Sequence, residues 1–290
     1  MKQLLILSGK GGTGKTTVAS AFIHLARAKA YADCDVDAPN LHLISGRQGE
    51  PVTMDYYGMP KAVIDPARCT ACGLCLTHCR FGAVIQDGGM RIDPYVCEGC
   101  GVCEAVCTAG AISMQKVPAG EMVLYADGEA VFSTAKLKMG SGTTGKLVTE
   151  VKRRMNELAR PETPLAVIDG SPGIGCPVIA SLSGVDMALL VAEPSVSGIS
   201  DLERIIKTAG GLGVKLGVCV NKYDLNLEMT KKIEALCKAL CLPYLGNIPF
   251  DPKAVSAVNR GLAVTEVDCE AGRAVTAVFY KAMRLLFEDA

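Results

Sequence analysis

A glycine-rich segment near the start of the chain, SGKGGTGKTT at residues 8–17, constrains the fold more than any other stretch. It follows a short apolar run at 3–7 and precedes apolar residues at helix spacing over 16–27. The order strand, G-x4-G-K-T, helix is typical of a phosphate-binding loop, in which backbone N–H groups and a helix N-terminus face phosphate oxygens. A nucleotide-binding α/β domain is therefore predicted.

The rest of the chain alternates short apolar runs with helical patterns. Continuous apolar runs indicate strands buried on both faces of a parallel sheet. Strands separated by helices predict a doubly wound, mostly parallel sheet. The expected strands lie at 28–32, 165–169, 187–192, 214–220 and 244–248, and the expected helices at 198–209, 227–240 and 271–287.

An internal repeat interrupts this alternation. IDPARCTACGLCLTHC at 64–79 matches IDPYVCEGCGVCEAVC at 92–107, 28 residues later, in Ile, Asp, Pro and all four cysteines. Such self-similarity indicates two copies of one small unit. We predict an inserted α+β domain at 61–116 and a discontinuous nucleotide-binding domain at 1–60 and 117–290. Residues 117–146 form a return segment for which no element is predicted.

Each copy of the repeat spells C-x2-C-x2-C-x3-C, the spacing of iron–sulfur ligands. Three cysteines of such a run bind one cluster and the fourth binds the other. A pair of zinc sites is the alternative, but zinc modules usually supply two C-x2-C pairs separated by a longer loop. Two [4Fe–4S] clusters are therefore predicted, one on Cys69, Cys72, Cys75 and Cys107, and one on Cys79, Cys97, Cys100 and Cys103.

This segment resembles the bacterial two-cluster ferredoxins over about fifty residues. It departs from them in one respect, because Arg80 and Thr108 replace the proline that usually follows the fourth cysteine. The departure leaves the ligands intact and weakens any inference about the cluster potentials.

Within the phosphate-binding loop, Lys15 is expected to bridge the β- and γ-phosphates of ATP, and Thr16 to bind Mg²⁺ through its hydroxyl. Asp169 ends an apolar strand, as a carboxylate must to reach the water shell of that ion. The loop residues expected to bind ATP are Gly9, Lys10, Gly11, Gly12, Thr13, Gly14, Lys15, Thr16 and Thr17.

Five motifs, KGGTGKT, DCDVD, DGSPGIG, VNKYD and IPFDP, occur in an order that resembles the MinD/ParA-like ATPases, which include the nitrogenase iron protein and the Mrp-type cluster carriers. The resemblance implies that Lys10 reaches the nucleotide of a partner subunit in an ATP-sandwich dimer. It also implies that Asp35 positions the attacking water and helps to hold Mg²⁺. The adenine contacts that it implies are Asn221, Pro249 and Asp251.

Two weaker features remain. GSGTTGKL at 140–147 also fits G-x4-G-K, but Leu147 replaces the Mg²⁺-binding hydroxyl and no clear strand precedes it, so we expect a loop and helix start near the dimer face. Cys176 lies seven residues after Asp169. By resemblance to the nitrogenase iron protein it is a candidate ligand of an extra cluster or sulfur species. The cysteines expected in structural or core positions are Cys34, Cys219, Cys237, Cys241 and Cys269.

The arrangement as a whole resembles MinD-superfamily ATPases that contain an inserted ferredoxin domain. The resemblance implies slow, dimer-dependent hydrolysis of Mg-ATP, in a homodimer or a heterodimer with a paralogue, coupled to electron transfer or metal-cluster assembly with a partner protein. The alternatives are a positioning ATPase that occupies membrane or DNA, and a ferredoxin-type electron carrier whose nucleotide site is regulatory.

Charge and hydropathy bear on the partners. Thirty basic and thirty acidic side chains cancel, so nothing in the net charge predicts binding to nucleic acid or to an anionic membrane. No apolar run is long enough for a membrane span, and the N-terminus does not read as a secretory signal. A cytoplasmic protein is expected.

Overall fold

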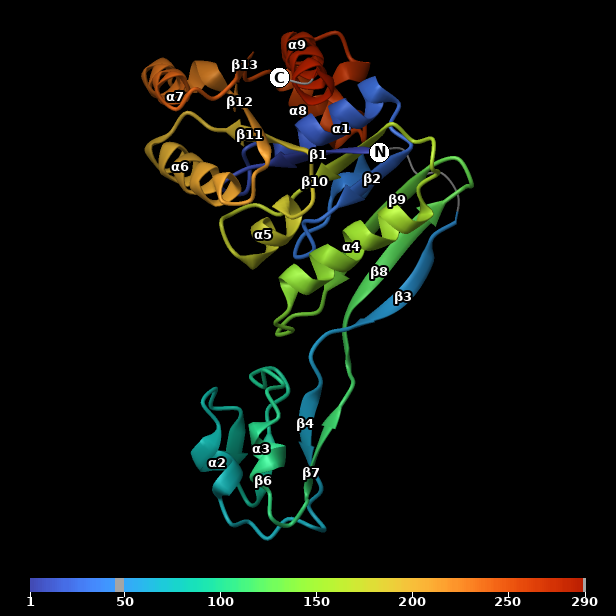
Figure 1. The fold of residues 1–290 in the computed structure, drawn as a ribbon, viewed down its shortest axis with the longest axis vertical. Coiled ribbons are helices and arrows are strands. Elements are labelled where there is room, and N and C mark those ends of the chain that lie inside the picture. The colour runs from blue at the N-terminus through green and yellow to red at the C-terminus, as the bar shows by residue number, and fades with distance from the viewer. Residues whose placement is uncertain (45–49, 289–290) are drawn as a thin grey trace.

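The computed structural model describes residues 1–44 and 50–288. It consists of a large body and a small module, joined by two extended segments that run side by side (Figure 1). The body contains both chain ends. The module contains residues 61–115 and hangs from one edge of the body.

A nine-stranded sheet runs through the described part of the body, in the order β13-β12-β11-β1-β10-β2-β9-β8-β3. Neighbouring strands from β13 to β9 are parallel, whereas β9, β8 and β3 pair antiparallel. The predicted α/β fold with a mostly parallel sheet is confirmed. The strands are β1 (Lys2–Leu7), β2 (Ala30–Asp33), β3 (Val52–Tyr57), β8 (Pro118–Ala126), β9 (Val131–Leu137), β10 (Leu165–Asp169), β11 (Met187–Ala192), β12 (Lys215–Asn221) and β13 (Tyr244–Ile248).

Helices cover both faces of this sheet. One apolar layer packs four helices against it, namely α4 (Thr144–Leu158), α5 (Cys176–Leu182), α6 (Val196–Gly210) and α7 (Leu227–Ala239). The opposite layer contains α1 (Lys15–Ala26), α8 (Pro252–Asn259) and α9 (Glu270–Phe287). Short 3₁₀ turns lie at Leu41–Leu43, Tyr223–Leu225 and Val264–Glu266.

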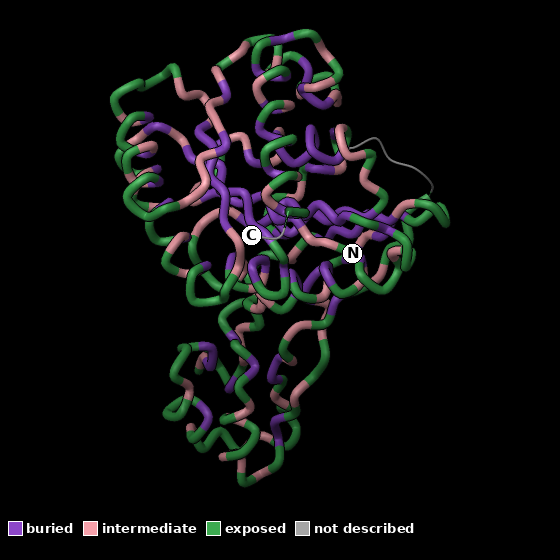
Figure 2. The backbone as a smooth tube through the Cα atoms, turned by 45° about the horizontal axis from the view of Figure 1, so that its top comes forward, coloured by how far each residue is buried: buried purple, intermediate pink, exposed green. Residues whose placement is uncertain are grey.

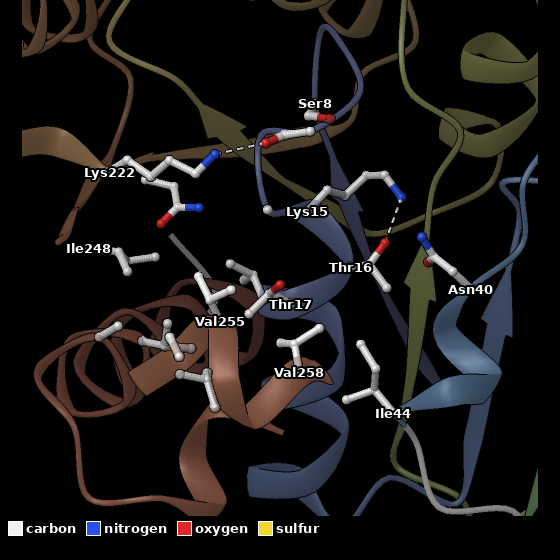
Figure 3. Close-up of a pocket in the computed structure, with 18 of the residues that line it drawn as sticks. Ser8, Lys15, Thr16, Thr17, Asn40, Ile44, Lys222, Ile248, Val255 and Val258 are labelled. Carbon is white, nitrogen blue, oxygen red and sulfur yellow. Dashed lines mark hydrogen bonds between the residues drawn. The ribbon is translucent and has the colours of Figure 1, made fainter. Parts of the chain in front are cut away.

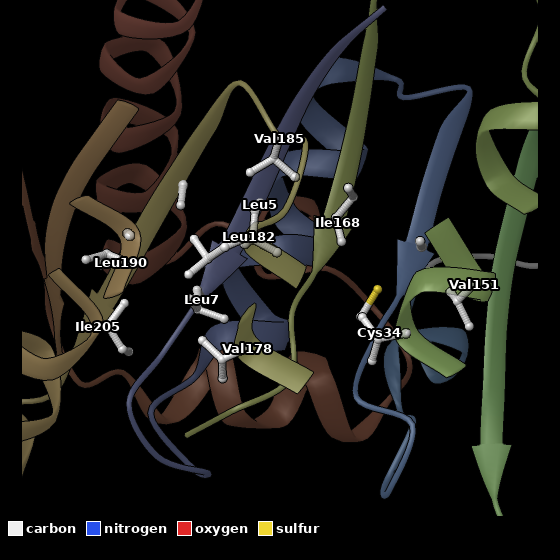
Figure 4. Packing of buried hydrophobic residues seen from close by; sticks show 14 of the residues in the cluster. Leu5, Leu7, Cys34, Val151, Ile168, Val178, Leu182, Val185, Leu190 and Ile205 are labelled. Atoms are coloured by element: carbon white, nitrogen blue, oxygen red, sulfur yellow. The ribbon is translucent and has the colours of Figure 1, made fainter. Parts of the chain in front are cut away.

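The alternation of side chains along β1 shows why the sheet needs both layers. Leu5 and Leu7 enter the layer of α4, α5 and α6 (Figure 4), and Leu4 and Ile6 enter the layer of α1 and α9. All four are fully buried. Burial of each contributes about 1.5–3 kcal/mol to folding. A run without polar residues is therefore stable only as a strand in the middle of such a sheet.

The module has little regular structure. Two short antiparallel pairs, β4 with β7 and β5 with β6, flank two helices of four or five residues. Their bounds are β4 (Lys61–Ile64), α2 (Leu74–His78), β5 (Val84–Gln86), β6 (Met90–Ile92), α3 (Val102–Ala105) and β7 (Ile112–Gln115).

Three sequence expectations differ from the structure. The strand expected at 28–32 lies at Ala30–Asp33, because the αL residue Arg27 ends the preceding helix and the chain turns before it enters the sheet. The return segment forms β8, β9 and the start of α4. Strand β3 was not predicted, since it is an edge strand with mostly exposed side chains and lacks a continuous apolar run.

Candidate functional site

The phosphate-binding loop lies between β1 and α1, at the edge of the sheet where the parallel strands end. Gly12 and Gly14 have φ angles of 79° and 90°, which only glycine adopts without strain. A Cβ on Gly14 would also overlap the side-chain amide of Asn221. The loop can therefore turn its backbone N–H groups toward a phosphate because two of its residues lack side chains.

Lys15 and Thr16, the first residues of α1, both contact the carboxylate of Asp169 at the end of β10. The Lys15 ammonium lies 2.6 Å from Asp169 Oδ1, and the Thr16 hydroxyl donates to Oδ2 at 2.7 Å. Lys15 and Asp169 are 5% and 0% exposed. Burial alone lowers the pKa of Lys15, but the attraction of Asp169 outweighs it and raises that pKa, so the lysine stays charged.

The loop after β2 is held by a carboxylate that sequence reasoning did not single out. Asp33 is fully buried and accepts hydrogen bonds from the backbone N–H groups of Asp35, Asn40 and Leu41, at 2.9 to 3.0 Å. Burial, reinforced by the negative charge of Asp169, raises the pKa of Asp33 to about 7. Its position at the end of a parallel strand, two residues before Asp35, was the available signal.

Asp35 itself lies half-buried on the wall of the nucleotide cavity. Burial raises its pKa, and the nearby ammonium of Lys15 opposes that rise. The carboxylate is therefore near Lys15, at the phosphate end of the site. The resemblance to the MinD/ParA-like ATPases implies that Mg²⁺ and the attacking water bind there.

The ammonium of Lys10 is paired with side chains that follow β11. Its ammonium lies 2.8 Å from a carboxylate oxygen of Glu193 and within 3.4 Å of the hydroxyls of Ser195 and Ser197, at the start of α6. Glu193 follows β11 directly and was not predicted. In this single chain, Lys10 therefore forms an ion pair with Glu193 of its own subunit.

A cavity of about 730 Å³ opens beside the loop (Figure 3). Lys15 and Thr16 lie at one side of it, and Ile248, Val255 and Val258 supply apolar wall (Figure 3). Most of the predicted ATP-binding and catalytic residues line this cavity. Gly9, Thr13 and Asp169 do not. The predicted residues that line it are Lys10, Gly11, Gly12, Gly14, Lys15, Thr16, Thr17, Asp35, Asn221, Pro249 and Asp251.

Asn221 and Asp251 both make structural hydrogen bonds in this cavity. The Asn221 amide donates to the carbonyl of Thr13 at 2.6 Å and so fixes the loop. Asp251 caps α8 through the N–H of Lys253 at 2.9 Å and also accepts from Ala271 N. These bonds hold the polar rim at which a base could lie, and the adenine contacts themselves remain predictions.

The second G-x4-G-K segment is a loop followed by a helix, because α4 begins at Thr144. One reason for expecting no second nucleotide site was wrong, since β9 leads into this segment. The other reason holds. Leu147, in the first turn of α4, is fully buried in the place of the hydroxyl that Mg²⁺ would need, and Lys146 is exposed.

In the module, each predicted set of four cysteines lines one cavity. One cavity is bounded by Cys69, Cys72, Cys75 and Cys107, and the other by Cys79, Cys97, Cys100 and Cys103. The last cysteine of each run has thus crossed to the other run, as the ferredoxin pattern requires.

Backbone N–H groups favour the thiolate at three of these sulfurs, whereas burial raises the pKa values of Cys75 and Cys103. Ala71 N and Ala111 N donate to the sulfurs of Cys69 and Cys107, at 3.4 and 3.2 Å. Burial raises the pKa of Cys79, but hydrogen bonds from the N–H groups of residues 81–84 outweigh it and lower that pKa. Such N–H groups tune the sulfurs of iron–sulfur clusters.

The remaining cysteines divide between core and surface. Cys34, Cys219, Cys237 and Cys269 are buried, as expected, whereas Cys241 is exposed with φ 53°, so its assignment to the core was wrong. It lies two residues beyond the end of α7, just after the C-cap Leu240. Cys176 is the exposed first residue of α5.

Two features are absent from residues 1–44 and 50–288. No group of three or more His, Cys, Asp or Glu side chains is close enough to bind a single metal ion. Among the described helices, none has the length and apolar character needed to cross a membrane.

Comparisons with known proteins agree with a nucleotide-binding domain. Residues 4–264 match the model of the CobQ/CobB/MinD/ParA nucleotide binding domain. The uncharacterized protein MJ0578 of Methanocaldococcus jannaschii is 34% identical over 229 residues, 77% of this chain and 79% of that protein. An iron-sulfur cluster carrier protein of the same organism is 22% identical, over 93% of this chain and 79% of its own.

A solved structure shares the fold. The septum site-determining protein MinD of Pyrococcus horikoshii, complexed with Mg-ADP, superposes with a TM-score of 0.59 at 17% identity, over 98% of this chain and 96% of that one.

Proposed function

Because the chain belongs to the CobQ/CobB/MinD/ParA family of nucleotide-binding domains, we propose that it is a dimeric iron–sulfur ATPase. In this proposal it binds and hydrolyses Mg-ATP, carries two [4Fe–4S] clusters, and couples changes of the dimer to electron transfer or metal-cluster assembly. The observation that carries the proposal is the gathering of eight cysteines into two sets of four, in a module joined to a phosphate-binding body.

The ion pair of Lys15 with Asp169 supports a simple order of events at the nucleotide. Without a ligand, the carboxylate satisfies both Lys15 and the Thr16 hydroxyl. Phosphates of ATP compete for Lys15, since they carry more charge than one carboxylate. Asp169 would then be free of Lys15. Thr16, Asp35 and Asp169 are the residues that would hold Mg²⁺, which when bound would neutralise charge on the phosphates.

Lys10 has the complementary role in the dimer. Its ion pair with Glu193 is half-exposed and therefore weak enough to exchange for a phosphate of the partner's nucleotide. Asp35 would orient the attacking water, and its position on the cavity wall supports that role. Hydrolysis would then depend on the meeting of two chains.

The module at 61–116 is proposed as a ferredoxin-like domain. Its cysteine sets and the N–H groups directed at their sulfurs fit two [4Fe–4S] clusters. When bound, the clusters supply one-electron transfer. Cys176 remains a candidate for a further cluster or sulfur species, because it is exposed next to the loop at 169–175. A redox or metallocofactor-assembly protein would be the partner, in the cytoplasm.

Two rival functions follow from the same features. The fold shared with MinD allows a positioning ATPase, and the module allows an electron carrier with a regulatory nucleotide site. Balanced charge and the eight cysteines count against stable membrane or nucleic-acid binding. The dimer can be a homodimer or a heterodimer with a paralogue.

Anaerobic purification with iron and sulfide analysis tests the proposal first. About eight irons per chain are expected for two clusters of this type. Oligomeric state and cluster potentials are then measured with ADP and with a non-hydrolysable ATP analogue. A protein whose clusters and oligomeric state ignore the nucleotide would be an electron carrier with a separate ATP site, and ATP-dependent sedimentation with vesicles or DNA would favour the positioning function.

A further inference from the structure

The two copies of the cysteine repeat occupy different places relative to the body. The second copy lies at the junction, where the Lys61 ammonium donates to the carbonyl of Cys97 and a Cβ on Gly99 would overlap the carbonyl of Pro60. The first copy turns at the far end of the module (Figure 1). There Arg68 approaches the carbonyl of Ala109 at 3.5 Å, within the module itself.

The loop before α4 touches the second copy directly. A Cβ built on Gly140 would lie 3.0 Å from the ring of Tyr95, and one on Gly142 would lie 2.9 Å from the carboxylate of Glu98. Both contacts use residues in which the copies differ, because the first copy has Ala67 and Thr70 at the equivalent positions. The two cluster sites are therefore not equivalent in their relation to the body.

The other end of the same loop reaches the nucleotide-sensing part of the body. A Cβ on Gly145, in the first turn of α4, would lie 3.2 Å from the carbonyl of Cys176. Further along α4, the buried Lys152 ammonium donates to the carbonyls of Ser181 and Ser183, at 2.8 and 2.6 Å. Separation of α4 from α5 would leave this ammonium buried without partners, so the two helices should move together.

Helix α5 is in turn continuous with the loop that follows Asp169. Within that loop the Gly173 N–H donates to Ser8 O at 3.1 Å, and the Ser171 hydroxyl donates to the carbonyl of Cys34. Release of Asp169 from Lys15 on nucleotide binding would act on this segment first. Contacts thus run without a break from the phosphate site, through α5 and α4, to the second copy of the repeat.

The contact at the module end is slight enough to be switched. Tyr95 remains 72% exposed, and Gly140 and Gly142 are also exposed. An interface of this size can open or close with the free energy that differential nucleotide binding supplies. A large apolar interface would instead have locked the module to the body.

We propose that the second copy of the repeat is the nucleotide-sensing one, with residues 138–143 and α4 as the relay from the body. The first copy, at the free end of the module, is left to meet the partner protein. This inference rests on the proposed function and adds to it which cluster site responds to ATP.

Hydrogen exchange on the cluster-loaded protein tests the relay, with Mg-ADP compared against Mg²⁺ and a non-hydrolysable ATP analogue. Exchange at 94–101 and 138–143 should differ several-fold between the two nucleotides, whereas exchange at 66–73 should not. If the nucleotides protect 9–17 and leave 94–101 unchanged, the inference is wrong. If the protein lacks clusters or does not protect 9–17, the proposed function itself fails.

A pair of glycine variants makes the test specific. Gly142→Ala places a methyl group against Glu98, whereas Gly89→Ala makes the same change in open space within the module. Gly142→Ala should diminish the nucleotide response at 94–101, and Gly89→Ala should leave it intact. In a Glu98→Ala background, Gly142→Ala should have no further effect, because the group that it meets is gone. Equal responses in the two glycine variants would overturn the relay.

Discussion

The body and the module of this chain are held together by different means. The body buries two continuous apolar layers, which appear as the dense buried backbone of Figure 2. The buried core of the module is much smaller and includes two cysteines of the proposed cluster sites, Cys75 and Cys97, beside Ala62, Ala83, Val84, Met90 and Ile112. Too little apolar area is buried there for independent stability, so we expect the module to need the proposed clusters in order to fold.

The difference extends to the sites. In the body, Lys15 and Asp169 neutralise each other, so the nucleotide site is stable without its ligand. In the module, eight thiol groups surround two cavities, which we propose hold the clusters. We therefore expect cofactor loss to unfold the module and to spare the body.

Substitution of one ligand is the strongest test of this contrast. Cys97→Ser should remove a cluster and abolish hydrogen-exchange protection across 61–116, while ATP still protects 9–17. Cys241→Ser, at an exposed cysteine of the body, serves as the control and should leave the iron content unchanged. Full iron content and a protected module in the Cys97 variant would show that the apolar core suffices.

Asp169→Asn tests the same contrast between body and module by removing a charge from the nucleotide site of the body. The change leaves Lys15 buried without its counter-ion, and should lower the free energy of unfolding by about 3 kcal/mol. ATP hydrolysis should fall by roughly 10² to 10³ through loss of a charged group at the phosphates. Iron content should stay the same. Urea unfolding, phosphate release and iron analysis measure the three, and Asp37→Asn, at an exposed carboxylate of the same site region, is the matched control.

Lys10→Ala distinguishes ATP binding, which needs one chain, from hydrolysis that depends on the dimer. Because Lys15 remains, ATP binding should persist, while hydrolysis should fall on the order of a hundredfold. Stability should change by less than about 1 kcal/mol, since the pair with Glu193 is half-exposed. The rate per chain, measured against protein concentration, should rise in the wild type only. An unchanged rate in the variant would make Lys10 an ordinary loop charge.

The raised pKa of Asp33 predicts that the stability of the body depends on pH. Its pKa is raised from 3.8 to about 7, so between these values the folded state binds more protons than the unfolded state. Stability from this group is therefore full below about pH 4 and is lost as the pH rises to 7, by up to about 1.4 kcal/mol per unit. In urea unfolding, the free energy of unfolding of the wild type should fall relative to that of Asp33→Asn as the pH rises from 4 to 7. Parallel curves would contradict the assignment.

Sequence reasoning reached the parts of this protein that rest on local patterns. Apolar runs identified β10, β11 and β13 at their observed bounds, and glycine spacing identified the phosphate-binding loop. Cysteine spacing predicted the two sets that the structure brings together. The cluster assignment itself remains a prediction.

What sequence reasoning missed depends on contacts between distant segments. Strand β3 pairs with β8 some 60 residues later, and its exposed face hides it from a hydropathy pattern. Glu193 could not be singled out from the sequence, because its part in the site is its ion pair with the distant Lys10. The role of Gly142 likewise depends on Glu98, which the sequence alone does not place beside it.

The way in which the module joins the body has a consequence for the history of such chains. Strands β3 and β8 are antiparallel neighbours, and Tyr57 pairs with Pro118, so the whole module occupies the tip of one edge hairpin. A short turn between these residues would close the hairpin and leave the nine-stranded sheet whole. The module, in which we propose the clusters bind, is thus a separable insertion, which recombination could add to, or delete from, an ancestral gene without disturbing the fold of the body.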